Sequence, residues 1–290
     1  MFEGISTAIV TPFRNGEIDE PALRGLIDRQ IAAGVDALVP CGSTGESATM
    51  SHEEHARVVA ITVSAVRGRI AVLAGTGSNN TREAIDLTQR AKDAGADGAL
   101  LISPYYNKPT QDGIYEHYKA IAEQTGFPLV VYNIPGRTGS NILPSTLARL
   151  ASLDNIVGVK EACGNIEQIA SVVDQCPDGF SIVSGDDGMT LPLIALGGHG
   201  LIATSANVAP VEMTQLVRAC LDGDFARARA LHFKLMPLFD VLFCETNPIP
   251  VKAALALMGL ISPEIRLPLL DMTEANRERL QVVLKELGLL

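Results

Sequence analysis

The chain has 290 residues, of which 47% are hydrophobic and 19% are charged, so it is long and apolar enough to fold around a large core. Its formal net charge is -10 and its 23 basic residues are scattered, which argues against binding to a nucleic-acid backbone. Glu3 and the absence of a positive region before the first apolar stretch argue against a secretion signal, and no window is typical of a membrane span. The five cysteines are odd in number, widely spaced and free of C-x-x-C pairs, which favours reduced thiols in the cytoplasm.

Eight short apolar runs alternate with helical segments along the chain. In order they cover residues 6–13, 36–42, 70–77, 98–104, 128–135, 156–162, 181–187 and 200–206. The runs are continuously apolar, which is the pattern of strands covered on both faces of a parallel sheet. Glycine-containing helix endings such as "DAGADGALL" precede several of them. Eight such units predict an α/β fold, a (β/α)8 TIM barrel over residues 1–223, followed by added helices over residues 224–290.

Polar side chains stand where these predicted strands end. In a TIM barrel the carboxyl ends of the strands form one rim, where the active site is built. We therefore expect the following residues to converge there: Thr11, Ser43, Thr44, Tyr105, Tyr106, Tyr132, Asn133, Arg137, Lys160, Gly185, Asp186 and Asp187.

Lys160 follows directly on the apolar run 156–159. An exposed lysine at the end of an edge strand is the ordinary interpretation, but the strands of a barrel have no edge. A lysine amine attacks a carbonyl only when deprotonated, and desolvation lowers its pKa from about 10.4 toward roughly 7 to 8. The pattern therefore indicates a Schiff-base lysine. Tyr132 and Tyr106 are candidate proton shuttles, connected by the hydroxyl of Ser43 or Thr44.

Three further motifs have competing interpretations. "GSTGES" at 42–47 lacks the lysine of a phosphate-binding loop, so a small bound carboxylate fits better. "HEEH" at 52–55 lacks the metalloprotease spacing, whereas Ser51 and Glu54 make a capping box that predicts exposed histidines in a first helical turn. The aspartates 186–187 have no further clustered carboxylates and are expected to form hydrogen bonds in the barrel mouth. We expect neither a metal nor another cofactor.

These motifs together resemble the dihydrodipicolinate synthases, within the N-acetylneuraminate lyase superfamily. The resemblance covers essentially the whole chain. It is carried by "GSTGES" at 42–47, "SPYYNKP" at 103–109, "YNIPGRTG" at 132–139, "GVKEA" at 158–162 and "GGHGLIATSANV" at 197–208. It implies a lyase that condenses pyruvate with L-aspartate 4-semialdehyde to 4-hydroxy-tetrahydrodipicolinate, on the route to diaminopimelate and lysine.

The resemblance also implies catalytic roles. Lys160 would form the imine with pyruvate, and Tyr132 would be the main proton donor and acceptor. Ser43 and Tyr106 would complete the relay, with Tyr106 contributed by the neighbouring subunit of a tight dimer within a homotetramer. Many members of the family have threonine where this chain has Ser43. Serine keeps the hydroxyl but loses the methyl group that restricts χ1.

The same resemblance implies binding roles at the rim. Ser43 and Thr44 would hold the carboxylate of pyruvate, and Arg137 would hold that of the second substrate. Gly185 and Ile202 would line the pocket through their backbones. Feedback-sensitive members of the family bind L-lysine at the tight-dimer interface. The matching positions in this chain are Ser47, Ala48, His52, His55, Asn79, Glu83 and Tyr105.

Two alternatives remain at this point. A sister sugar-acid lyase also uses a Schiff-base lysine and shares the serine at position 43, but such lyases generally lack the arginine at position 137. A non-catalytic keto-acid sensor on the same scaffold is the second alternative. It is favoured only where the lysine or a tyrosine is missing, and this chain has both.

Overall fold

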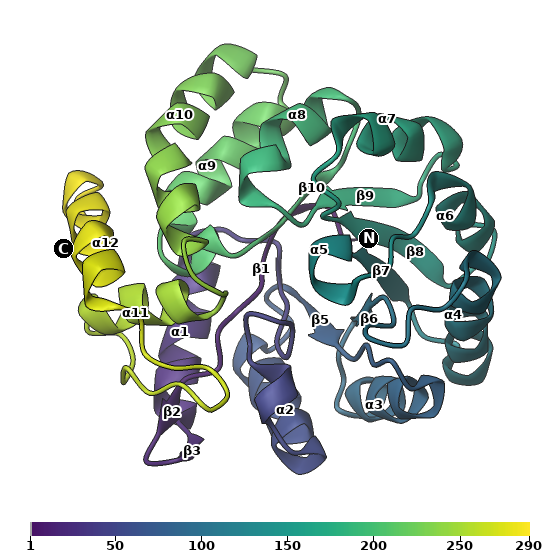
Figure 1. Cartoon of the computed structure of the whole chain (residues 1–290), viewed down its shortest axis with the longest axis horizontal. Helices are drawn as coiled ribbons and strands as arrows, with labels where there is room; N and C mark the ends of the chain where they lie inside the picture. Colours follow the sequence, from purple (N-terminus) through teal and green to yellow (C-terminus); the bar gives the residue numbers. More distant parts are fainter. Residues whose placement is uncertain (1) are drawn as a thin grey trace.

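Eight parallel strands close into a barrel in the computed structural model, which describes residues 2–290 (Figure 1). The strands are β1 (Gly4–Thr7), β4 (Ala37–Leu38), β5 (Ala71–Gly75), β6 (Gly98–Ile102), β7 (Leu129–Asn133), β8 (Ile156–Glu161), β9 (Ser181–Ser184) and β10 (Gly200–Ala203). β1 pairs with both β10 and β4, which closes the ring. The predicted TIM barrel is confirmed.

The first predicted strand lies a few residues too late in the sequence. β1 ends at Thr7, although the chain beyond it still bonds to neighbouring strands, with Ala8 N–H donating to the Ala203 carbonyl at 2.9 Å. Residues 13–18 instead form a hairpin that the analysis did not predict, of β2 (Phe13–Arg14) and β3 (Glu17–Ile18). Asn15 and Gly16 both have positive φ, as the two central residues of a type I′ turn require.

Helices surround the barrel in sequence order (Figure 1). They are α1 (Glu20–Ala32), α2 (His52–Val66), α3 (Thr81–Asp93), α4 (Gln111–Thr125), α6 (Pro144–Leu150), α7 (Ile166–Gln175), α8 (Thr190–Ala195) and α9 (Pro210–Leu221), with the short α5 (Pro135–Thr138) directly after β7. Single 3-10 turns stand at Ser47–Thr49, Asp187–Met189 and Ser205–Asn207. The predicted capping box of α2 is confirmed, because Ser51 and Glu54 exchange hydrogen bonds of 3.2 and 2.9 Å.

The C-terminal part of the chain consists of α10 (Phe225–Leu242), α11 (Ile249–Leu257) and α12 (Glu274–Glu286), which lie together against one side of the barrel (Figure 1). A division of the chain at residue 223 stays a proposal, which the end of α9 at Leu221 supports. No helix within residues 2–290 has the length and apolarity needed to cross a membrane. All five cysteines are free.

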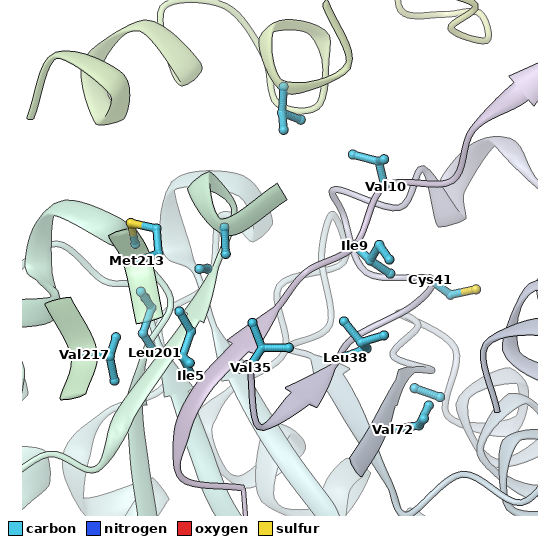
Figure 2. Close-up of a cluster of buried hydrophobic side chains, with 14 of the residues drawn as sticks. Ile5, Ile9, Val10, Val35, Leu38, Cys41, Val72, Leu201, Met213 and Val217 are labelled. Carbon is cyan, nitrogen blue, oxygen red and sulfur yellow. The ribbon is translucent and has the colours of Figure 1, made fainter. Parts of the chain in front are cut away.

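Two apolar clusters build the core. The larger one lies between strands and helices, where Ile5 and Leu201 of neighbouring strands pack near Met213 and Val217 of α9 (Figure 2). The smaller one fills the barrel interior with Phe2, Ala8, Val39, Leu73, Leu100, Val130, Tyr132, Val183 and Ile202. Because the interior is apolar up to Tyr132, a charged group placed beside it loses much of its hydration.

Candidate active site

Lys160 and Tyr132 lie side by side at the carboxyl end of the barrel. They are register partners on β8 and β7, so their side chains leave the sheet on the same face. Lys160 Nζ lies 4.2 Å from the centroid of the Tyr132 ring. The structure thus brings together the predicted nucleophile and the predicted proton carrier.

Burial sets the protonation of both groups. Lys160 is only 5% exposed, and desolvation lowers its pKa from 10.5 to about 8. The Asp187 carboxylate opposes this shift and the Arg137 guanidinium adds to it. Burial raises the pKa of Tyr132, so the phenol keeps its proton at neutral pH. An amine that titrates near pH 8 beside a protonated phenol is equipped for attack on a carbonyl.

The loop "GSTGES" forms a tight turn beside this pair. The Gly45 N–H donates to the Gly42 carbonyl at 3.1 Å, and a Cβ on Gly45 would stand 3.0 Å from the Cys41 backbone nitrogen, so a larger residue would crowd the backbone of the turn. Within residues 2–290, the N–H groups of Ser43 and Thr44 donate to no backbone carbonyl. Both donors are therefore available to an anion, as in other loops that bind carboxylates.

Asn247, from the C-terminal part of the chain, connects Thr44 and Arg137, two of the predicted binding residues. Its Nδ2 donates to Thr44 Oγ1 at 2.9 Å, and its carbonyl accepts from Arg137 Nη2 at 3.1 Å. Asn247 Oδ1 is buried without a protein partner in the described chain. Asn247 was not predicted from the sequence, because no local motif marks a residue that is 203 positions away from its partner Thr44.

Asp187 has the hydrogen-bonding role that the sequence predicts. The carboxylate is fully buried and accepts from the Thr204 N–H at 3.2 Å, the Ser205 N–H at 2.8 Å and Ser205 Oγ at 2.6 Å. Burial raises the pKa of Asp187, and the three donors oppose that shift. Asp186 is exposed, and among residues 2–290 its side chain accepts only from the nearby Gly188 N–H.

A small cavity of about 40 Å³ lies directly over Lys160. Six of the eight predicted catalytic and binding residues line it: Ser43, Thr44, Tyr132, Arg137, Lys160 and Gly185. A seventh, Ile202, does not line it but belongs to the same interior cluster as Tyr132. A Cβ on Gly185 would stand 2.8 Å from Lys160 Cε, so only glycine leaves room for the lysine stem.

Tyr106 is the predicted catalytic residue that this chain does not bring to the site. Its side chain is 89% exposed, with φ of 70°, and it lines neither cavity near Lys160. Its role therefore stays a prediction that involves a second subunit.

A larger cavity of about 590 Å³ adjoins the catalytic one, and Ser43, Tyr132 and Arg137 line both. Six of the seven positions matched to lysine binding also line it: Ser47, Ala48, His52, His55, Glu83 and Tyr105. The seventh, Asn79, does not line it, and its Nδ2 donates to the carbonyl of Tyr105, which does, at 3.2 Å.

The two histidines of "HEEH" have different environments. His52 is exposed and its Nε2 lies 2.8 Å from Glu83 Oε1, and Ser78 Oγ donates to the other oxygen of Glu83. His55, which the sequence analysis expected to be exposed, is buried, with Nε2 2.7 Å from the Gly75 carbonyl. That expectation was wrong for His55, because the buried face of α2 continues through Val58, Val59 and Thr62.

A buried ion pair, also not predicted from the sequence, connects the loop "GSTGES" to the C-terminal part of the chain. Lys252 Nζ of α11 donates to Glu46 Oε1, and the two side chains are 2% and 0% exposed. Lys252 Nζ lies 4.6 Å from the Phe13 ring centroid, and Arg266 stacks on the same ring at 3.9 Å. Apart from Lys252, every residue of α11 is apolar, and this composition is the one signal in the sequence that Lys252 is buried.

Comparisons with known proteins agree with this geometry. The model of the dihydrodipicolinate synthetase family matches residues 1–287. The chain belongs to that family. It is 60% identical, over 100% of both chains, to the 4-hydroxy-tetrahydrodipicolinate synthase of Syntrophus aciditrophicus. The resemblance stated from the sequence motifs is thus confirmed.

Solved structures of family members superpose on the whole chain. One is a chloride-inhibited dihydrodipicolinate synthase of Acinetobacter baumannii complexed with pyruvate, with 45% identity, a TM-score of 0.98 and full coverage of both chains. Another is the enzyme of Cyanidioschyzon merolae with lysine bound, with 41% identity, a TM-score of 0.96, and coverage of 100% of this chain and 99% of that one.

Proposed function

We propose that this chain is a lyase that joins pyruvate to L-aspartate 4-semialdehyde through an imine at Lys160, giving 4-hydroxy-tetrahydrodipicolinate for diaminopimelate and lysine biosynthesis. The observation that carries the proposal is the Lys160 amine, buried against the Tyr132 ring with its pKa lowered to about 8. Family membership supports the choice of substrates. The free cysteine thiols support a cytoplasmic location.

In the first half of the reaction, the neutral Lys160 amine attacks the ketone carbon of pyruvate. Water leaves and an imine forms, which gains a proton on nitrogen. The cationic imine draws electrons from the methyl carbon, which loses a proton to become an enamine. Tyr132 stands beside Nζ and transfers these protons, with Ser43 as its relay partner. The available N–H groups of Ser43 and Thr44 hold the pyruvate carboxylate.

In the second half, the enamine carbon attacks the aldehyde carbon of the second substrate. Arg137 binds the carboxylate of that substrate, and the buried Oδ1 of Asn247 accepts from its amino group. The substrate's own amine then replaces Lys160 on the imine carbon, which closes the ring and releases the lysine. The condensation and the loss of water leave the total oxidation state of the two substrates unchanged, so the reaction needs no redox partner.

A trapping experiment tests the proposal. Borohydride with pyruvate is expected to reduce the imine and leave a three-carbon secondary amine on Lys160, with loss of activity, while Lys160→Met forms no adduct. Peptide mapping by mass spectrometry separates Lys160 from the other six lysines, including the buried Lys252. An adduct on another lysine, or none, contradicts the mechanism. Efficient cleavage of N-acetylneuraminate instead favours the sugar-acid lyase.

We also propose that the working assembly is a homotetramer of tight dimers in which Tyr106 acts in the partner's site. Its 89% exposure and its absence from the lining of both cavities near Lys160 support the role in the partner's site. Mixing inactive Tyr106→Phe with inactive Lys160→Met subunits is expected to restore activity, because a mixed dimer then contains one complete site. No recovery after subunit exchange contradicts the shared site.

A further inference from the structure

Glu161 is a buried carboxylate that the proposed reaction does not use. It follows Lys160 on β8 and is 1% exposed. None of the salt bridges formed within residues 2–290 includes it. Burial raises its pKa, and hydrogen-bond donors oppose that shift. Because an unpaired carboxylate in a protein interior is costly, its neighbours must stabilise it in another way.

Asn133 and the Cys163 backbone donate hydrogen bonds to this carboxylate. Asn133 Nδ2 donates to Glu161 Oε1 at 3.0 Å and to Oε2 at 3.2 Å, so the amide bridges both carboxylate oxygens. The Cys163 N–H donates to Oε1 at 2.8 Å. Asn133 is itself fully buried, and its Oδ1 accepts from the Ile142 N–H at 3.0 Å. Both side chains therefore have fixed positions.

The two residues form the rung of the sheet that follows the catalytic rung. β7 and β8 pair Tyr132 with Lys160 and then Asn133 with Glu161. Successive side chains of a strand point to opposite faces. Tyr132 and Lys160 face the cavity inside the barrel, so Asn133 and Glu161 face outward, toward the layer of helices. The strand ends that carry the nucleophile and the phenol are thus joined from behind.

The outward rung is anchored to the surrounding segments. Asn133 Nδ2 also donates to Asn141 Oδ1 at 2.9 Å, and Asn141 exchanges hydrogen bonds of 2.7 and 3.1 Å with Gln168 of α7. The bond from Ile142 to Asn133 fixes the chain that returns from α5, the short helix that carries Arg137. One polar network therefore sets the positions of β7, β8 and the segment after α5.

We propose that Asn133 and Glu161 are positioning residues, which clamp β7 to β8 on the outer face of the barrel and thereby hold Lys160 Nζ against Tyr132 on the inner face. Neither touches the cavity over Lys160, so neither exchanges protons with the substrate. The inference rests on the imine chemistry proposed above. Its consequence is that loosening the clamp slows proton transfer between Tyr132 and the imine more than it weakens pyruvate binding.

Substitutions that interchange amide and carboxylate side chains at positions 133 and 161 test the clamp. Glu161→Gln keeps the side-chain shape but loses one acceptor, and Asn133→Asp places a second carboxylate against Glu161. The double variant Asn133→Asp/Glu161→Gln restores one donor facing one acceptor, with the roles exchanged. Thr88→Val is the matched control, because it removes a buried 2.8 Å hydrogen bond between α3 and Thr76, which follows β5, away from β7 and β8. Melting temperature, kcat, KM for pyruvate and the pH midpoint of borohydride trapping are measured for each.

We expect each single variant to lower kcat about ten- to a hundredfold, since a misplacement of about 1 Å has that effect, with KM for pyruvate changed less than about twofold. The trapping midpoint should move above pH 8 as water reaches Lys160. The double variant should recover most of kcat. Thr88→Val should lower only the melting temperature.

Two results overturn the clamp. Single variants that resemble Thr88→Val, with lower stability but unchanged kcat and trapping midpoint, show a structural role alone. A folded double variant as slow as the single ones excludes the donor and acceptor pairing. If Glu161→Gln does not fold, Asn133→Ser, which removes the bridging donor, replaces it under the same criteria. Trapping in the unaltered protein comes first: no adduct there contradicts the proposed function, whereas an adduct together with unaffected variants contradicts only the clamp.

Discussion

Lys160 and Tyr132 occupy the same rung of the barrel, and Lys160 Nζ lies 4.2 Å from the centre of the Tyr132 ring. An ammonium is attracted to the face of an aromatic ring, which by itself would keep the lysine charged. Desolvation in the apolar mouth has the larger effect, because the pKa of Lys160 falls to about 8. The same burial keeps Tyr132 protonated, so the pair combines an available amine with an available proton.

The pH dependence of imine formation follows from this pKa. The neutral amine is the reactive form, and with a pKa of about 8 its fraction rises from about a tenth at pH 7 to about nine tenths at pH 9. Borohydride trapping with pyruvate, at fixed short times, should therefore increase with pH and level off above about pH 9. A midpoint near pH 10.5, the ordinary value for lysine, would contradict the desolvated environment.

Charge changes at two neighbours should shift that midpoint in opposite directions. Asp187 raises the pKa of Lys160, so Asp187→Asn should move the trapping midpoint to lower pH, and should also destabilise the fold because three donors lose a carboxylate. Arg137 lowers the pKa of Lys160, so Arg137→Gln should move the midpoint to higher pH. Shifts of the same sign in both variants would show that the midpoint reports something other than these charges.

Arg137 should also distinguish the two substrates. Removing a charged hydrogen bond to a carboxylate costs about 1.5–3 kcal/mol, which corresponds to a ten- to hundredfold change in affinity. Arg137→Ala should therefore raise KM for L-aspartate 4-semialdehyde by about that factor, with a much smaller effect on KM for pyruvate. Steady-state kinetics with each substrate varied in turn measure this split. Equal effects on both would place Arg137 elsewhere in the mechanism.

Local sequence patterns were sufficient to predict the barrel and the polar residues at the carboxyl ends of its strands. The continuous apolar runs predicted all eight strands, and the lysine at the end of one of them indicated a candidate nucleophile. The hairpin at residues 13–18 does have a local signal, the turn sequence Asn15-Gly16. The burial of His55 was also predictable from the sequence, because Val58, Val59 and Thr62 follow it at spacings of three, four and seven residues, which place them on one helix face.

Long-range partners could not be predicted from a single sequence. Asn247 reaches Thr44 across 203 positions and Lys252 reaches Glu46 across 206, and neither has a local signal for its partner. The contact between Asn133 and Glu161 could not be predicted for the same reason, since the register of β7 and β8 decides which residues meet. Tyr106 is a different case, because its proposed environment is the site of a second subunit, and within its own chain the side chain is exposed.

The buried pair of Lys252 and Glu46 should be important for stability. Removing one partner of such a pair leaves a lone charge in a dry interior, which costs about 3–5 kcal/mol. Lys252→Met should lower the free energy of unfolding by about that amount in denaturant titrations. Lys252→Met/Glu46→Gln should recover much of the loss, because no lone charge remains. A double variant no more stable than Lys252→Met would show that shape, and not charge, dominates at this site.

The larger cavity leads to a prediction about regulation by L-lysine. Six of the seven positions matched to lysine binding line this cavity, and so do Ser43 and Tyr132 of the catalytic site, so a ligand there has a short physical route to the chemistry. Glu83, held by His52 and Ser78, presents a carboxylate for the ligand's ammonium groups. Millimolar L-lysine should inhibit partially, with a coupling of about 1–3 kcal/mol.

Glu83→Gln should abolish most of this inhibition while leaving the uninhibited rate nearly unchanged, because the substitution removes the charge and lies away from Lys160. Glu53→Gln, an exposed carboxylate on the neighbouring helix that lines neither cavity, is the matched control and should be inhibited like the unaltered chain. Inhibition curves and the shift in melting temperature with L-lysine measure both effects. If L-lysine changes neither rate nor melting temperature, the cavity is not a lysine site. The same conclusion follows if Glu83→Gln and Glu53→Gln respond alike, because only Glu83 lines the cavity, and its charge would then have no influence on the ligand.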